Sequence, residues 1–241
     1  IGDADWLGLY ARDLQGRPVP EGVVEAAVTL DQPFRAFNER MLLAVPTFVS
    51  RLYAMDDASR TPEAVLELAR RCEQEVLGLS GSPRPLLAIP HLLSGEASAS
   101  YQGYLLAHMG VYQTRAFFLE RDGQLTDNPR IGADLARHYW NPGNAASHDQ
   151  TLRSLTGNGL SGRALADSCN LAADELWRQA RLQMRRALAR PAQDDAADLD
   201  ARIRIVHGAA AIADNAGSMH EMWDRFAGWV QATYRRGAGA A

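Results

Sequence analysis

The sequence contains no lysine, so all 25 of its basic residues are arginine. We attribute this absence to the codon composition of a GC-rich genome and not to chemistry. No stripe of basic residues stands out, and the net charge at neutral pH is −4. A nucleic-acid-binding surface normally needs a concentrated positive charge. We therefore expect no nucleic acid among the partners.

Cysteine is also scarce, since only Cys72 and Cys169 are present and they do not form a Cys-x-x-Cys pair. Two buried thiols in a reducing cytoplasm are the simplest interpretation. No apolar run approaches the length of about 20 residues that spans a bilayer, and no signal peptide is visible in these residues. We expect a cytoplasmic protein without a membrane partner.

Two further motifs are incomplete. Neither 78–81 nor 159–162 completes a Gly-x-Ser-x-Gly nucleophile elbow, and no predicted strand precedes either segment. His220-Glu221 starts a His-Glu-x-x-His pattern, but Asp224 occupies the position of the second histidine. The first departure argues against a serine hydrolase. The second favours a solvated helix face around His220 over a metal site.

Apolar residues recur with helical spacing along almost the whole chain, which predicts an all-α fold. Caps such as Thr61-Pro62-Glu63 and breaks such as Gly16 and Gly78 delimit the segments. We expect helices over about 3–14, 20–30, 33–52, 61–79, 99–121, 128–140, a short segment ending at 157, another capped by Ser161, and 171–190. On the helix over 99–121, the expected inward residues are Tyr104, Leu105, His108, Val111, Tyr112, Ala116 and Phe117; on the helix over 171–190 they are Leu176, Trp177, Ala180, Met184 and Leu188.

A change of composition after residue 190 predicts two domains. Residues 1–190 form a helical lobe, and the linker 191–195 leads into a helical extension that ends in a disordered Gly/Ala tail at 241. The extension reads as one or two helices with a break near 215–217. Its stripe Trp223, Phe226, Trp229 and Val230 should pack on the lobe or on a partner.

The stretch from Ile89 to Tyr104 carries the strongest functional signal. It places His91 and Gly95 in a loop, followed by a helix whose first turns carry Tyr101 and Tyr104. Residues three apart lie on one helix face, and an imidazole and two phenols can all donate hydrogen bonds. Such a group of donors is suited to an oxyanion.

This stretch resembles the substrate-binding loop of the thimet oligopeptidase and oligoendopeptidase F family of zinc peptidases. Members carry a histidine, a glycine-rich turn and a helix that opens with Tyr-x-x-Tyr; His91, Gly95, Tyr101 and Tyr104 match in that order. The resemblance extends over about residues 3–175 and includes the turn 139–144.

The chain departs from the family at two places. Glu96-Ala97-Ser98 stands where members usually have another aromatic residue. The zinc-binding His-Glu-x-x-His helix and its third ligand would lie before Ile1. Because the first residue is also not Met, we expect the chain to be the C-terminal part of a longer protein.

The resemblance implies a multi-helix lobe that forms one wall of a peptide channel. Zinc would belong to the intact protein and not to this chain, which alone is expected to be inactive. Short peptides and the N-terminal part of the same protein are the implied partners. Tyr104 and His91 take catalytic roles, and Tyr101, Gly95 and His108 take substrate-binding roles.

Three alternatives remain open. His108 could face the cleft, because it follows Tyr104 by four residues, or it could be a core histidine bonded to a neighbour. The chain could belong to a relative that binds peptides without cutting them. It could also be a helical interaction module that docks a partner through Trp223 and Trp229.

Overall fold

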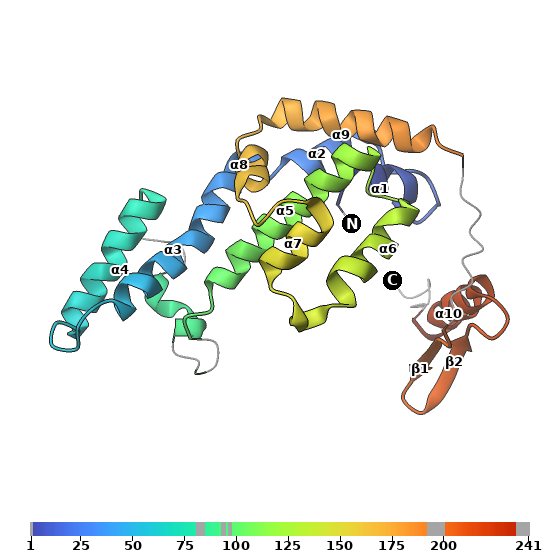
Figure 1. Cartoon of the computed structure of the whole chain (residues 1–241). Helices are drawn as coiled ribbons and strands as arrows, with labels where there is room; N and C mark the ends of the chain where they lie inside the picture. Colours follow the sequence, from blue (N-terminus) through green and yellow to red (C-terminus); the bar gives the residue numbers. More distant parts are fainter. Residues whose placement is uncertain (1, 81–84, 93–94, 96–97, 192–200, 235–241) are drawn as a thin grey trace, which may run out of the picture. The chain divides into compact units, whose positions relative to one another are not determined.

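The computed structural model describes residues 2–80, 85–92, 95, 98–191 and 201–234. The chain divides into two compact units, residues 1–190 and 191–241, and this division falls where the composition changes. The described residues are predominantly helical (Figure 1), as the periodicity predicted. None of their helices is both long and apolar enough to cross a membrane.

The first unit is built from helices joined by short 3-10 segments. Its α-helices are α1 (Ala4–Tyr10), α2 (Glu21–Thr29), α3 (Arg35–Tyr53), α4 (Pro62–Leu77), α5 (Gln102–Asp122), α6 (Pro129–Leu135), α7 (His148–Thr156), α8 (Arg163–Cys169) and α9 (Ala173–Leu188). The 3-10 segments are η1 (Gln32–Phe34), η2 (Leu86–Ala88), η3 (Pro90–Leu92) and η6 (Gly143–Ala145), and the π-helical turn η5 covers Ala136–Trp140.

Capping residues set several of these boundaries. The Thr61 hydroxyl accepts a hydrogen bond of 3.3 Å from the Ala64 N–H, and Pro62 occupies the first helical position of α4. Gly78 ends α4 with φ at +71°, a conformation that glycine adopts without steric cost. The predicted boundaries of this helix are therefore confirmed.

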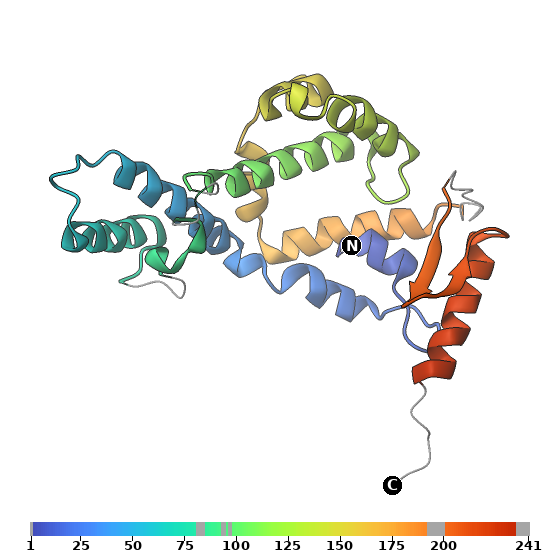
Figure 2. The same cartoon turned by 90° about the horizontal axis from the view of Figure 1, so that it is seen from below.

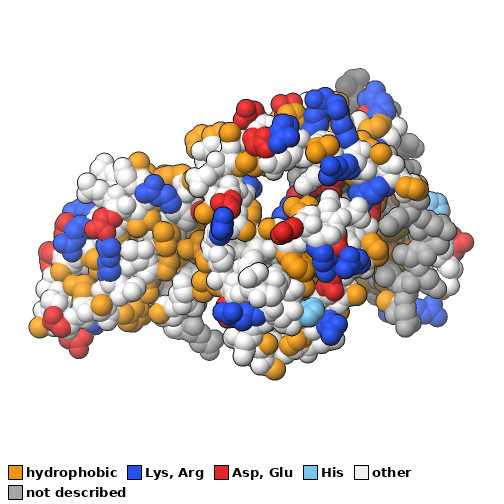
Figure 3. All heavy atoms as spheres, turned by 45° about the horizontal axis from the view of Figure 1, so that its top comes forward, with side chains coloured by type: hydrophobic (Ala, Val, Ile, Leu, Met, Phe, Trp, Pro, Cys, Tyr) orange, Lys and Arg blue, Asp and Glu red, His pale blue; other side chains and the backbone are white. Residues whose placement is uncertain are grey.

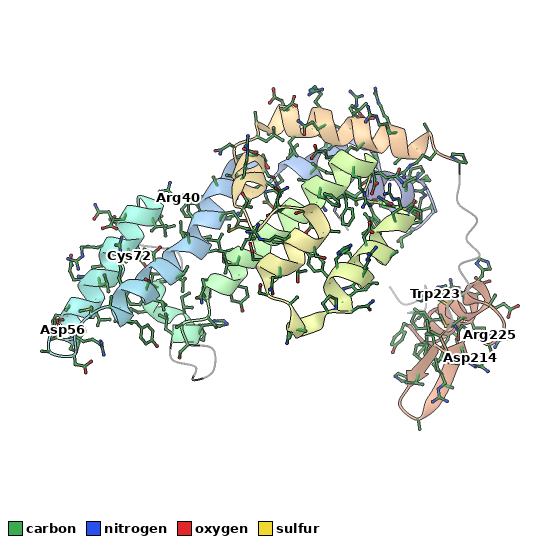
Figure 4. All side chains as sticks on the ribbon, viewed as in Figure 1. Arg40, Asp56, Cys72, Asp214, Trp223 and Arg225 are labelled. Carbon is green, nitrogen blue, oxygen red and sulfur yellow. The ribbon has the colours of Figure 1, made fainter. Side chains whose placement is uncertain are left out.

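The helices α3 and α4 enclose the larger core. Phe48 and Cys72 are fully buried between them, and Figure 4 labels Cys72 on α4. Leu86, Ile89 and Tyr101 belong to the same core. The Leu86 N–H donates a buried hydrogen bond of 2.9 Å to Oε1 of Glu73 on α4. Packing and hydrogen bonding together hold η2 on α4.

The helices α1, α2 and α9 form a second layer around Ala4, Val24 and Met184 (Figures 1 and 2). Arginine side chains gather on the outer face of α9 (Figure 3), as predicted. The expected inward position of Leu188 is wrong, because this side chain is 54% exposed.

The long helix α5 packs against α3, α7 and α8. Its inward face differs from the predicted one: Tyr104 and Val111 are half exposed, whereas Gly110 and Phe118 are buried. The reason is that α7 approaches α5 closely at Gly110, where a Cβ atom would lie 2.5 Å from Nε2 of His148. Periodicity could not reveal this contact because glycine carries no apolar side chain.

The second unit contains a hairpin where the sequence predicted a helix. The antiparallel strands β1 (Arg204–His207) and β2 (Ala210–Asp214) precede α10 (Met219–Tyr234). Gly208 opens the turn between the strands with φ at +59°. The helix α10 packs on β2, and Ala213 of β2 and Met222 of α10 are buried. The predicted linker and Gly/Ala tail lie largely outside the described residues.

The contact at Gly110 gives a test of the fold. Gly110→Ala should change the free energy of unfolding little, because the gain of about 1 kcal/mol that alanine has over glycine inside a helix is offset by the cost of turning the exposed His148 ring away from the new methyl group. Gly103→Ala is the matched control on the same helix, since its Cβ would meet no atom within 4 Å; it should raise stability by about 0.5 kcal/mol. Urea unfolding of both variants measures the difference, and equal effects would refute the close approach of α7.

A polar junction joins α5 to α6. The Asp122 carboxylate accepts hydrogen bonds from Arg121 at 2.6 and 2.9 Å, from Asn128 at 2.9 Å and from Arg130 at 2.8 Å. The hydrogen bonds from Arg121 are the main reason that the pKa of Asp122 falls from 3.8 to about 2. The ionised form is therefore favoured in the folded chain.

This lowered pKa predicts a specific acid sensitivity. The contribution of ionised Asp122 to the free energy of unfolding should be fully present above pH 3.8 and should be lost as the pH falls through about 2. Asp122→Asn should consequently flatten the fall of the unfolding free energy over that interval. Asp57→Asn, at a carboxylate that is 95% exposed, is the control. Urea unfolding at several acidic pH values would contradict the assignment if both variants kept the wild-type slope.

Candidate functional site

The predicted loop residues do come together at the start of α5. His91 lies in η3, Tyr101 immediately precedes α5 and Tyr104 lies in its first turn. The His91 ring centroid lies 5.3 Å from that of Tyr101 and 5.7 Å from that of Tyr104, and both pairs meet edge to face. The two tyrosine rings are 5.0 Å apart. We call these residues the aromatic cluster.

The two tyrosines of the aromatic cluster differ in exposure. Tyr101 is 5% exposed and belongs to the core that α3 and α4 enclose. Tyr104 is 49% exposed, and its hydroxyl lies 3.2 Å from Nε2 of His91. Tyr104 can therefore reach a ligand, whereas Tyr101 lies in the core and contacts the rings of His91 and Tyr104.

Gly95 lies between the two halves of this loop and is exposed. Its carbonyl accepts a hydrogen bond of 3.1 Å from the Ser98 N–H, and its φ is +41°. A side chain would strain this backbone conformation. Glu96 and Ala97, where the chain departs from the family, lie outside the described residues.

His108 lies one turn further along α5 and pairs with α3. Its Nδ1 atom is 3.1 and 3.0 Å from the two carboxylate oxygens of Glu39. Of the two alternatives for His108, this pairing matches the one in which the histidine bonds to a neighbouring residue. Its side chain is 45% exposed, however, and is not part of the core. No pattern in the sequence pointed to Glu39, because 69 residues separate it from His108.

The two cysteines offer no activated nucleophile. Both are free thiols, with Cys72 buried and Cys169 partly buried. Burial is the main cause that raises the pKa of each thiol, and the charge of Glu39 raises that of Cys169 further. Because the thiolate is the reactive form, the structure disfavours cysteine chemistry at either position.

A hollow of about 550 Å³ opens beside the start of α5. Pro46, Val49 and Tyr53 of α3 line one side, and Ala99 and Gln102 line the other. The sequence carried no signal for this hollow, because its lining combines residues 46–54 with residues 99 and 102, which are distant along the chain. Most of its lining is apolar, which suits a hydrophobic group.

Metal-binding side chains do not converge in the described part of the chain. No group of three or more His, Cys, Asp and Glu residues there has a suitable arrangement for an ion. His220 and Asp224 lie 3.6 Å apart with side chains that are 89% and 70% exposed, on the solvated face expected for them.

The aromatic cluster thus brings hydrogen-bond donors from an imidazole and two phenols together. Such a site can bind and polarise a carbonyl oxygen. No family model, curated protein or solved structure matches this chain.

Proposed function

We propose that this chain is the substrate-binding C-terminal lobe of a zinc-dependent oligopeptidase that cleaves internal bonds of short peptides. The observation that carries the proposal is the aromatic cluster, in which His91 touches a buried Tyr101 and a half-exposed Tyr104. The order of these residues is also the order in the thimet oligopeptidase and oligoendopeptidase F family. We place the protein in the cytoplasm, since both cysteines are free thiols.

Zinc fits no site within the described residues. In the proposed enzyme, as the family resemblance implies, the metal would be held by the N-terminal part of the same protein, and this chain alone would be inactive. The contribution of this chain is to bind the peptide and to donate hydrogen bonds to it.

Tyr104 is the residue placed to act on the reacting carbonyl. Its exposed hydroxyl can donate a hydrogen bond to the carbonyl oxygen as negative charge develops there, and one such donor typically supplies about 3–4 kcal/mol. Gly95 is exposed, and without a side chain it leaves room for a peptide backbone.

Replacement of Tyr104 tests this role in the full-length gene product. Tyr104→Phe should lower kcat about 100-fold or more and change KM far less, because the lost hydrogen bond is strongest in the transition state. Hydrolysis of short fluorogenic peptides measures both constants.

Tyr234→Phe is a suitable control, since this tyrosine is 62% exposed and lies in the other unit. Its kcat should equal that of the wild type. A kcat for Tyr104→Phe within about threefold of the wild type would remove Tyr104 from the proposed role.

A relative that binds peptides without hydrolysing them is a variant of the same proposal. The substitution of Glu96-Ala97-Ser98 for the family's aromatic position favours it. Retained affinity for peptides, with no hydrolysis in the presence of zinc, would identify this variant.

An interaction module is the second candidate, and the composition of the second unit favours it. Among its described residues, only Ala213 and Met222 are buried hydrophobic side chains, whereas Val206, Trp223 and Tyr234 are more than half exposed. A hairpin and one helix bury little surface by themselves. A partner surface for these side chains would add stability.

The two candidates differ in what Trp223→Ala should do. If the chain is an interaction module, this variant should abolish assembly in size-exclusion chromatography with light scattering, because it removes a 52% exposed aromatic side chain from the contact. Tyr104→Phe should then have no effect on assembly. If the chain is the peptidase lobe, Trp223→Ala should leave peptide hydrolysis unchanged.

A further inference from the structure

We propose that His91 is a positioning residue that donates a hydrogen bond from its Nε2–H to the Tyr104 oxygen, which leaves the Tyr104 proton available to a ligand oxygen. The statement that this ligand is a peptide carbonyl rests on the proposed function. The direction of the hydrogen bond rests on the geometry of the aromatic cluster alone.

The two ring nitrogens of His91 have different surroundings. Nε2 lies 3.2 Å from the Tyr104 hydroxyl, which can either donate or accept. Nδ1 is buried and has no hydrogen-bond partner among the described residues. A neutral imidazole carries one proton, so the choice of nitrogen decides which atom is left unpaired.

Burial of an unpaired N–H group decides between these tautomers. If the proton were on Nδ1, a buried donor would have no acceptor, and such orphaned N–H groups are rare in folded proteins. If the proton is on Nε2, it bonds to Tyr104 and only a lone pair is left at Nδ1. The second arrangement satisfies the donor and is the one we infer.

The direction of this hydrogen bond determines what Tyr104 can do. A phenol that already accepts a hydrogen bond keeps its own proton for another acceptor, and a chain of hydrogen bonds strengthens each member. Because Tyr104 is 49% exposed, that acceptor can be an oxygen atom of a bound molecule. A carbonyl or carboxylate oxygen fits, whereas an N–H donor would compete with His91.

Nuclear magnetic resonance of the 241-residue chain tests the tautomer directly. Long-range correlations between ring protons and ring nitrogens, recorded in alkaline buffer, distinguish the two forms, and the signals that disappear in His91→Gln belong to His91. We expect a protonated Nε2 and an unprotonated Nδ1. A protonated Nδ1, for example one directed at the face of the Tyr101 ring, would overturn the proposal.

A matched pair of substitutions tests whether the position of the donor matters. The amide nitrogen of glutamine can occupy the place of Nε2, whereas that of asparagine is too short to reach it. His91→Gln should keep the Tyr104 ring-carbon resonance, assigned with Tyr104→Phe in ¹³C-tyrosine-labelled protein, close to its wild-type position. His91→Asn should shift it, and equal shifts in both variants would contradict the proposal.

Binding of short peptides separates this inference from the proposed function. With both correct, His91→Asn should weaken peptide binding about five- to tenfold, as expected for one hydrogen bond, and His91→Gln should weaken it less than about threefold. If no peptide binds but the tautomer and the Gln/Asn difference are as expected, the proposed function fails and the hydrogen-bond direction stands. If peptides bind but the proton of His91 is on Nδ1, or the Gln and Asn variants behave alike, the hydrogen-bond direction is wrong and the proposed function stands.

Discussion

The buried hydrogen bond between the Leu86 N–H and the Glu73 carboxylate is the constraint on which the candidate site depends. Glu73 is 7% exposed, and a carboxylate at such a depth is stable only if it accepts hydrogen bonds. The bond fixes η2 against α4, and the apolar side chains of Leu86 and Ile89 then fill the core. His91 lies two residues after Ile89, so its position is fixed by the same packing.

The far end of the loop is anchored in the same core by Tyr101. Both ends are therefore held by α3 and α4, whereas Gly95 between them is exposed. This arrangement explains how a half-exposed phenol and a partly buried imidazole can keep a defined distance.

Local sequence signals were enough to predict most of the first unit. Thr61, Pro62 and Gly78 act on neighbouring backbone groups, and their effect does not depend on the rest of the fold. The hairpin in the second unit was missed because the alanines of β2 have a high helix propensity. Its available signals were the alternation Arg202-Ile203-Arg204-Ile205 and the glycine at the turn.

The site shows the same division between local and long-range information. Tyr101 and Tyr104 are three residues apart on one chain segment, so their proximity followed from helix geometry. The pairing of His108 with Glu39, and the buried position of Tyr101, depend on how α3 crosses α5. No single-sequence pattern specifies that crossing.

The π-helical turn Ala136–Trp140 has a consequence of its own. Its wider hydrogen bond, from the Asn141 N–H to the Ala136 carbonyl at 2.9 Å, accommodates one more residue than an α-helical turn. Consecutive side chains can thereby bond to two different helices: His138 lies 2.6 Å from the Ser154 hydroxyl on α7, and Tyr139 lies 2.8 Å from the Thr114 hydroxyl on α5. The extra residue acts as an insertion that ties α7 to α5, and a chain one residue shorter here would have to give up one of these two bonds.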